Sequence, residues 1–283
     1  MPESIARPSA PAGSAGRLTL RPPGAAAWAL ALALAVIPAL IAWRWLGGQV
    51  WDGSRPATCI PSACFCEAVR PSGIRQPSNT LSSFAFLPIA FLVLGRSFRR
   101  GEAVSPPAVY SLLYAGALFL IGLGSAFYHA SITFVGQVFD VSGMYLLGTF
   151  AVLHAASRLR PIRPGIVAVA YLALNAILVA VLLTAPVFRR YLFALLIALA
   201  IGLELRARRL RPATAAAGYL LGAVGLVAAG FLIWTLDLTR VICAPFGVVQ
   251  GHAVWHVLTA LGAGCLWRYY ELDWRPAPGR WAN

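Results

Sequence analysis

The chain has 283 residues, of which 59% are apolar and only 11% are charged, and its mean hydropathy is +0.74. Soluble proteins carry about 25% charged residues, so this composition excludes a water-soluble surface and indicates an integral membrane protein. The net charge of +14 comes from 23 arginines and no lysine. These arginines form short clusters between apolar runs, which is typical of membrane topology, so we expect no nucleic-acid partner.

The N-terminal part of the chain predicts a tail followed by a membrane helix. Residues 1–24 are rich in Pro, Ala, Gly and Ser and predict a disordered cytoplasmic tail. The apolar run 25–46 has the about 20 residues that a helix needs to cross roughly 30 Å of hydrocarbon. A cleaved signal peptide is the alternative, because arginines precede the run. The run is longer than most signal-peptide cores and WRWL is a poor cleavage site, so we favour a retained span.

Seven further apolar runs predict an all-α, polytopic transmembrane bundle of eight spans. Residues 47–80 would form an outer loop, 81–270 a seven-helix core and 271–283 a cytoplasmic tail. With the N-terminus in the cytoplasm, most arginines fall in cytoplasmic segments, so both termini are expected there. The absence of lysine beside many Ala, Arg, Gly and Pro residues is typical of GC-rich coding and indicates a bacterial inner-membrane protein. The seven runs are 81–97, 107–128, 138–156, 164–186, 190–205, 214–236 and 250–267.

Four cysteines fall in loops on the side opposite the arginine clusters. Cys59, Cys64 and Cys66 lie in the first outer loop, and Cys243 lies in the last. Disulfides form in the periplasm rather than in the cytosol, so this placement agrees with the topology. A sequence does not determine connectivity. We favour a Cys66–Cys243 bridge, with Cys64–Cys243 as the alternative and four unpaired thiols as the third case.

Five polar residues with catalytic or metal-binding side chains are expected at one membrane edge. Ser125 and His129 are four residues apart near the outer end of the third span, and His252 and His256 are four apart where the eighth begins. Residues four apart on a helix share a face, about 6 Å from each other. Asp140 begins the fourth span after a loop too short to carry it away from His129. All five therefore lie at one depth.

Three neutral imidazoles at one depth suit catalytic zinc, which takes three protein ligands and keeps a position for water. We expect His129, His252 and His256 to bind it, Asp140 to accept a proton from the zinc-activated water, and Ser125 to donate to an oxyanion. Each histidine taken singly is ordinarily an interfacial residue. Ionisable groups within spans are costly, however, so three histidines with one aspartate favour a functional site.

The remaining polar residues have ordinary explanations. His154 follows Asp140 by fourteen residues, which on a helix is about 21 Å, so it is expected near the opposite face. Asp237 is expected to pair with Arg240 at i, i+3.

Three segments resemble the signatures of alkaline ceramidases, whose wider group of membrane hydrolases includes adiponectin-type receptors and GPI-lipid remodelling proteins. They are CEAVRPSGIRQPSNTLSSFAFL, GLGSAFYHASITFVGQVFD and QGHAVWHVLTALG. The resemblance runs from about Cys64 to Tyr270. It implies that His129, His252 and His256 bind zinc and that Ser125 and Asp140 serve the hydrolysis.

The same resemblance implies a loop disulfide between Cys66 and Cys243. The chain differs from the ceramidases in two respects. The ceramidases have seven spans, so residues 25–46 would be an extra one. Eukaryotic members carry an acid-rich calcium site around this loop. Only Glu67 remains of it here, and Gln76 stands where a carboxylate is expected, so no calcium site is assigned.

The expected function is zinc-dependent hydrolysis of the amide bond of a ceramide-like lipid, reached from the bilayer, with release of a fatty acid. A receptor or sensor with a structural zinc is one alternative, and a lipid esterase or phospholipase is another. Ser125 and Asp140 favour catalysis over the sensor, because a structural metal needs neither.

Overall fold

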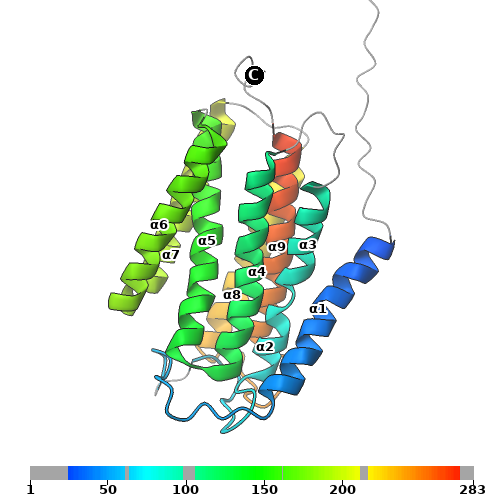
Figure 1. The fold of residues 1–283 in the computed structure, drawn as a ribbon, viewed down its shortest axis with the longest axis vertical. Coiled ribbons are helices and arrows are strands. Elements are labelled where there is room, and N and C mark those ends of the chain that lie inside the picture. Colours follow the sequence, from blue (N-terminus) through cyan, green and yellow to red (C-terminus); the bar gives the residue numbers. More distant parts are fainter. Residues whose placement is uncertain (1–24, 61–63, 98–105, 161, 211–215, 275–283) are drawn as a thin grey trace, which may run out of the picture.

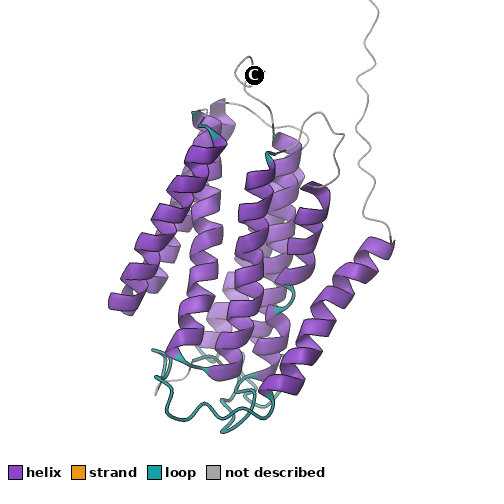
Figure 2. Ribbon diagram, viewed as in Figure 1, coloured by secondary structure: helices purple, strands orange, loops and turns teal. Residues whose placement is uncertain are grey.

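The computed structural model describes residues 25–60, 64–97, 106–160, 162–210 and 216–274. In these residues the chain forms α-helices and one short 3-10 helix, with no strand, so the predicted all-α class is confirmed (Figure 2). The expected tail at 1–24 and residues 275–283 lie outside the described residues. The helices are α1 Ala25–Leu46, α2 Pro77–Ser83, α3 Phe86–Ser97, α4 Ala108–Ser131, α5 Phe134–Leu159, α6 Pro164–Thr184, η1 Pro186–Phe188, α7 Arg189–Leu210, α8 Ala217–Leu238 and α9 Gly251–Asp273.

The long helices run side by side as a bundle, and six of those described are long and apolar enough to cross a membrane (Figure 1). These six comprise α2 with α3, then α4, α5, α6, α7 and α8. Many large apolar side chains on the outer helices are exposed, as a surface that faces lipid requires. The protein is therefore an integral membrane protein, and the count of eight spans stays a prediction.

Helix α1 forms over the predicted residues 25–46 and contacts α3 at the side of the bundle (Figure 1). Its described apolar stretch Leu32–Leu46 is shorter than the about 20 residues that a helix needs to cross a membrane. Its role as an additional span therefore stays a prediction.

Glycines allow α4 and α5 to pack closely, which sets the geometry of the site. A Cβ atom added at Gly143 would lie 2.8 Å from the backbone nitrogen of Ile121, and one at Gly124 would lie 2.9 Å from the backbone of Phe139. Small residues at such crossings let helix backbones approach each other in membranes. The two helices are joined by Ile132 and Thr133 alone, so Asp140 of α5 lies opposite α4.

The span predicted to begin at 81 begins instead at Pro77, and it is broken into α2 and α3. Pro77 occupies the first turn, where its missing N–H costs nothing. The Glu67 carboxylate accepts hydrogen bonds from the backbone nitrogens of Ser78 at 2.8 Å and Asn79 at 2.9 Å, which caps the helix start. The sequence pattern missed this turn because its residues are polar.

The segments 47–60, 64–76 and 239–250 gather at one end of the bundle, which we call the loop end (Figure 1). Two disulfides lie there: Cys66–Cys243, the pairing favoured from the sequence, and Cys59–Cys64, which was not foreseen. Because both pairs are bonded, the alternative Cys64–Cys243 pairing is wrong. Helix α9 ends at the opposite end of the bundle, and α1 begins on the side away from the loop end (Figure 1).

The opposite end is held by a partly buried ionic network. Arg158 of α5 forms ion pairs with Glu204 of α7 and Asp273 of α9, and the hydroxyl of Tyr269 donates to Glu204. His154 is buried nearby and packs against Tyr270, with ring centroids 3.8 Å apart and the two rings tilted by 33°. His154 therefore lies away from the other histidines, as its spacing indicated.

Candidate metal centre

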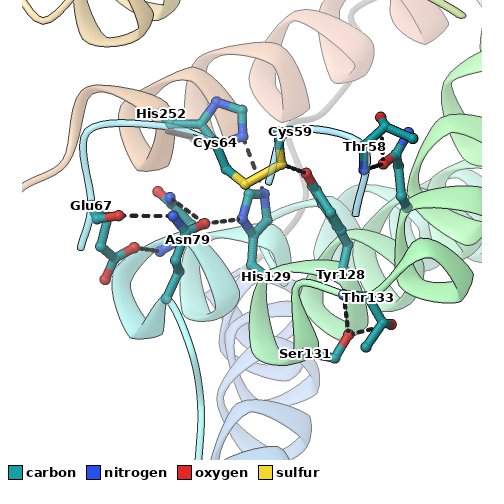
Figure 3. The surroundings of a disulfide bond; sticks show 12 residues. Thr58, Cys59, Cys64, Glu67, Asn79, Tyr128, His129, Ser131, Thr133 and His252 are labelled. Atoms are coloured by element: carbon teal, nitrogen blue, oxygen red, sulfur yellow. Dashed lines mark hydrogen bonds between the residues drawn. A yellow bond between two sulfur atoms is a disulfide. The ribbon is translucent and has the colours of Figure 1, made fainter. Parts of the chain in front are cut away.

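Three histidines from two helices converge inside the bundle near the loop end. His129 lies in the last turn of α4, while His252 and His256 lie in the first two turns of α9. One nitrogen from each ring lies within 4.8 Å of the others, and the Nε2 atoms of His129 and His252 are 3.1 Å apart. Figure 3 shows these two rings pointing toward one another. All three side chains are buried, with His129 fully so.

The start of α9 is placed by an aspartate at the end of α8. Asp237 is completely buried, and its Oδ2 accepts a hydrogen bond from the backbone nitrogen of His252 at 3.1 Å. Its Oδ1 accepts one from the backbone nitrogen of Cys66 at 3.0 Å. Gly251 is required beside it, because a Cβ atom there would lie 2.8 Å from Cβ of Asp237. The predicted pairing of Asp237 with Arg240 is wrong, since both carboxylate oxygens serve backbone donors.

Two of the histidine rings have a hydrogen-bond partner on Nδ1, the nitrogen that faces away from the cluster. One partner is the N-cap residue of α2 and the other lies in its last turn. Nδ1 of His129 lies 2.8 Å from Oε1 of Gln76, and Nδ1 of His256 lies 2.8 Å from Oγ of Ser82. The Ser82 hydroxyl donates to the carbonyl of Asn79 at 3.0 Å, so its oxygen is left to accept from His256. With the Ser82 proton given to Asn79, His256 carries its own proton on Nδ1, and the lone pair on its Nε2 is the one that could bind a metal.

The ring of His252 is held differently. Its Nδ1 is buried and has no hydrogen-bond partner among the described residues. The ring instead stacks on Phe65, with centroids 3.8 Å apart. Aromatic packing from the outer loop therefore takes the place of a polar contact at this ligand.

The donor set fits a metal ion. Two nitrogens on one tetrahedral zinc, each about 2.0–2.1 Å from the ion, lie about 3.4 Å apart, close to the 3.1 Å between His129 and His252. Lone pairs this close inside an apolar bundle repel each other unless a cation or proton lies between them. Among the described residues, no other group of three or more His, Cys, Asp or Glu side chains brings its ligand atoms close enough together to hold a metal ion.

Ser125 and Asp140 lie beside the cluster. Ser125 is one turn before His129 on α4, is 1% exposed, and has its Oγ 3.4 Å from Nε2 of His256. Asp140 is partly buried on α5 and has the Ser125 hydroxyl as a hydrogen-bond partner. The structure thus brings all five residues singled out in the sequence into one neighbourhood.

A family model described as Ceramidase matches residues 65–273. The chain belongs to the ceramidase family. The match confirms the resemblance, and it includes every residue of the metal centre as well as the Cys66–Cys243 disulfide. Helix α1 lies outside the part that matches the ceramidase family. A search of curated proteins finds no match.

Sequence reasoning missed the polar contacts that hold the ceramidase-family centre in place. Gln76 was noted only as a substitution for an expected carboxylate, Glu67 only as the remnant of a calcium site, and Asp237 only as a surface ion pair. Glu67 caps α2, and its pKa is raised by burial against the lowering effect of the hydrogen bonds from Asn79 and Ser78. Figure 3 shows Glu67 and Asn79 side by side. An acid or amide in an apolar chain is the signal that could have marked each of these residues.

Proposed function

We propose that this protein is a zinc-dependent hydrolase that cleaves the amide bond of a ceramide-like lipid and releases a fatty acid. The observation that carries the proposal is the convergence of His129, His252 and His256 beside Ser125 and Asp140, in a chain of the ceramidase family. A structural zinc would take four protein ligands. Three histidines with an adjacent carboxylate and hydroxyl suit catalysis better.

The chemistry divides between the metal and two side chains. Zinc held by the three histidines supplies a Lewis acid and lowers the pKa of its water to about 7. Asp140 accepts the proton of the attacking water and delivers it to the nitrogen of the leaving amine. The Ser125 hydroxyl donates a hydrogen bond to the oxygen of the amide carbonyl as negative charge develops on it. Water and amide are consumed, and a fatty acid and an amine leave.

The substrate reaches the site from the bilayer. The histidines are buried, and the bundle around them exposes apolar side chains to lipid. On the loop-end side, Arg75 and Gln76 donate backbone hydrogen bonds to Ala130 and His129, so the outer loop covers the end of α4. A lipid amide with its head near the loop end suits this arrangement.

The proposal puts the protein in a bacterial inner membrane, with both termini cytoplasmic and the site toward the periplasm. The disulfides lie at the loop end together with the histidines. Helix α9 ends at the opposite end of the bundle, and α1 begins away from the loop end (Figure 1). Oxidation of these cysteines requires the periplasmic side, which supports the orientation.

The test uses the purified protein, with its bound metal measured and fatty acid release followed for a panel of lipid amides, esters and phospholipids, with and without chelator. We expect chelator-sensitive release from the amides. His256→Ala should lose zinc and turnover, and Asp140→Asn should keep zinc but lose activity by about 10²-fold or more. His154→Ala is the matched control, because His154 lies outside the cluster.

Three results would contradict the proposal. Full activity in a metal-free His256→Ala protein would show that hydrolysis does not require zinc. An unchanged rate in Asp140→Asn would show that this carboxylate has no role in the reaction. Release from esters alone would make the protein a lipid esterase. Zinc without any hydrolysis would favour a sensor.

A further inference from the structure

Gln76 contacts the metal centre more closely than any other residue of the outer loop, and the proposed function gives it no role. It is completely buried, and it precedes α2 as the N-cap residue. We propose that Gln76 is a positioning residue that holds His129 in the tautomer and orientation needed to bind zinc. This inference rests on the zinc-dependent function proposed above.

The hydrogen bonds of the Gln76 amide determine which of its atoms faces the histidine. Its Nε2 donates to the backbone carbonyl of Glu67 at 2.8 Å, and a carbonyl oxygen can only accept. The other amide atom, Oε1, therefore lies 2.8 Å from Nδ1 of His129. An amide oxygen is also only an acceptor, so Nδ1 of His129 must carry the proton. The lone pair then resides on Nε2, which is the atom that faces His252 at 3.1 Å.

Further contacts keep the amide from turning. The backbone nitrogen of Gln76 donates to the carbonyl of His129 at 3.0 Å, so the two residues are joined through both backbone and side chain. The Nδ2 of Asn79 lies 3.4 Å from Oε1 of Gln76 and donates to it. Glu67 in turn holds the first turn of α2 through the nitrogens of Ser78 and Asn79. Rotation of the amide would break bonds at both of its ends.

The consequence for metal binding is specific to His129. Without an acceptor at Nδ1, the neutral ring can place its proton on Nε2, where it would block coordination. Loss of such an outer hydrogen bond typically costs 10–100-fold in metal affinity. His252 has no polar partner on Nδ1 among the described residues, so the loss of Gln76 removes no hydrogen bond from that ring.

The test compares two substitutions of Gln76 that differ in whether an oxygen atom remains to accept from Nδ1 of His129. Gln76→Met and Gln76→Glu both remove the donor to the Glu67 carbonyl, but glutamate keeps an oxygen for His129. The zinc dissociation constant would be measured by competition with a chromophoric chelator, together with the visible spectrum of the Co²⁺ form and the melting temperature without metal. We expect Gln76→Met to bind zinc about 10–100-fold more weakly than Gln76→Glu, while the melting temperatures of the two variants agree.

The outcomes separate this inference from the proposed function. A wild-type protein that binds no zinc ends the proposed function. If the wild type binds zinc and Gln76→Met binds it equally well, or if both variants lose affinity to the same extent, the positioning role of Gln76 is overturned. Should Gln76→Met fail to fold, Gln76→Asn replaces it, because the shorter amide cannot reach Nδ1 but stays polar. Unchanged zinc affinity in Gln76→Asn would overturn the inference equally.

Discussion

Asp237 joins the end of α8 to two segments of the site, and replacing it tests how much this single carboxylate contributes. Its two oxygens accept hydrogen bonds from the backbone nitrogens of Cys66 at 3.0 Å and His252 at 3.1 Å, with no exposure to solvent. Asp237→Ala leaves both donors buried without an acceptor. Each buried unsatisfied donor costs about 1–3 kcal/mol, so the free energy of unfolding should fall by about 2–6 kcal/mol.

This loss is large enough to measure in detergent-solubilised protein. For a protein of 283 residues, about 2–6 kcal/mol corresponds to a melting temperature lowered by roughly 3–10 °C. Zinc should also bind more weakly, because the first turn of α9 carries His252. Asp52→Ala is the control, since the side chain of Asp52 is 77% exposed and its contact with Arg75, at 3.4 Å, is that of a weak surface pair.

The reasoning would be refuted by a melting temperature of Asp237→Ala within about 1 °C of the wild type, since that shift is below the smallest one expected. An equal loss in Asp52→Ala would also refute it, because the effect would then follow the removed charge rather than the buried hydrogen bonds. Asp237→Asn should fall between the wild type and alanine, because it keeps one acceptor and turns an amide group toward the other donor.

Two further predictions concern packing and the opposite end of the bundle. Gly143→Ala should destabilise the protein by about 1–3 kcal/mol, because its Cβ atom meets the backbone of α4, whereas Gly116→Ala, which meets nothing within 4 Å, should be neutral or slightly stabilising. Equal melting temperatures for the two variants would count against the close helix crossing. Arg158→Met should cost about 3 kcal/mol, the lower end of the cost for a buried pair, because it leaves two largely but not fully buried carboxylates without their cation, while Arg160→Met at an exposed position should change little. Thermal unfolding of the two arginine variants decides this, and a tolerated Arg158→Met would show that the network contributes nothing.

Much of the fold could be predicted because membrane helices are encoded locally. Each predicted apolar run coincides with a helix, since about 20 apolar residues in succession suffice to define a span. The boundaries were less accurate where polar residues form helix. Helix α2 begins at Pro77, within the segment interpreted as loop, because its capping group is supplied by Glu67 from outside the helix.

The candidate site was predictable for a related reason. The four-residue spacing of Ser125 with His129, and of His252 with His256, places each pair on one face of one helix. The short connection to Asp140 then limits how far that residue can lie from α4. These relations depend on helix geometry and chain length alone.

The sequence by itself thus determined which segments form apolar helices and which polar residues share a helix face, because both follow from distances of a few residues along the chain. Only the tertiary structure decided that α4 and α9 bring three ring nitrogens within 4.8 Å, that Cys59 pairs with Cys64, and that Gln76 and Asp237 hydrogen-bond to two of these histidines. Apart from the Cys59–Cys64 bridge, these contacts join residues at least 15 positions apart in the chain, and they form because glycine-lined helices pack closely enough to bury polar groups that then require partners.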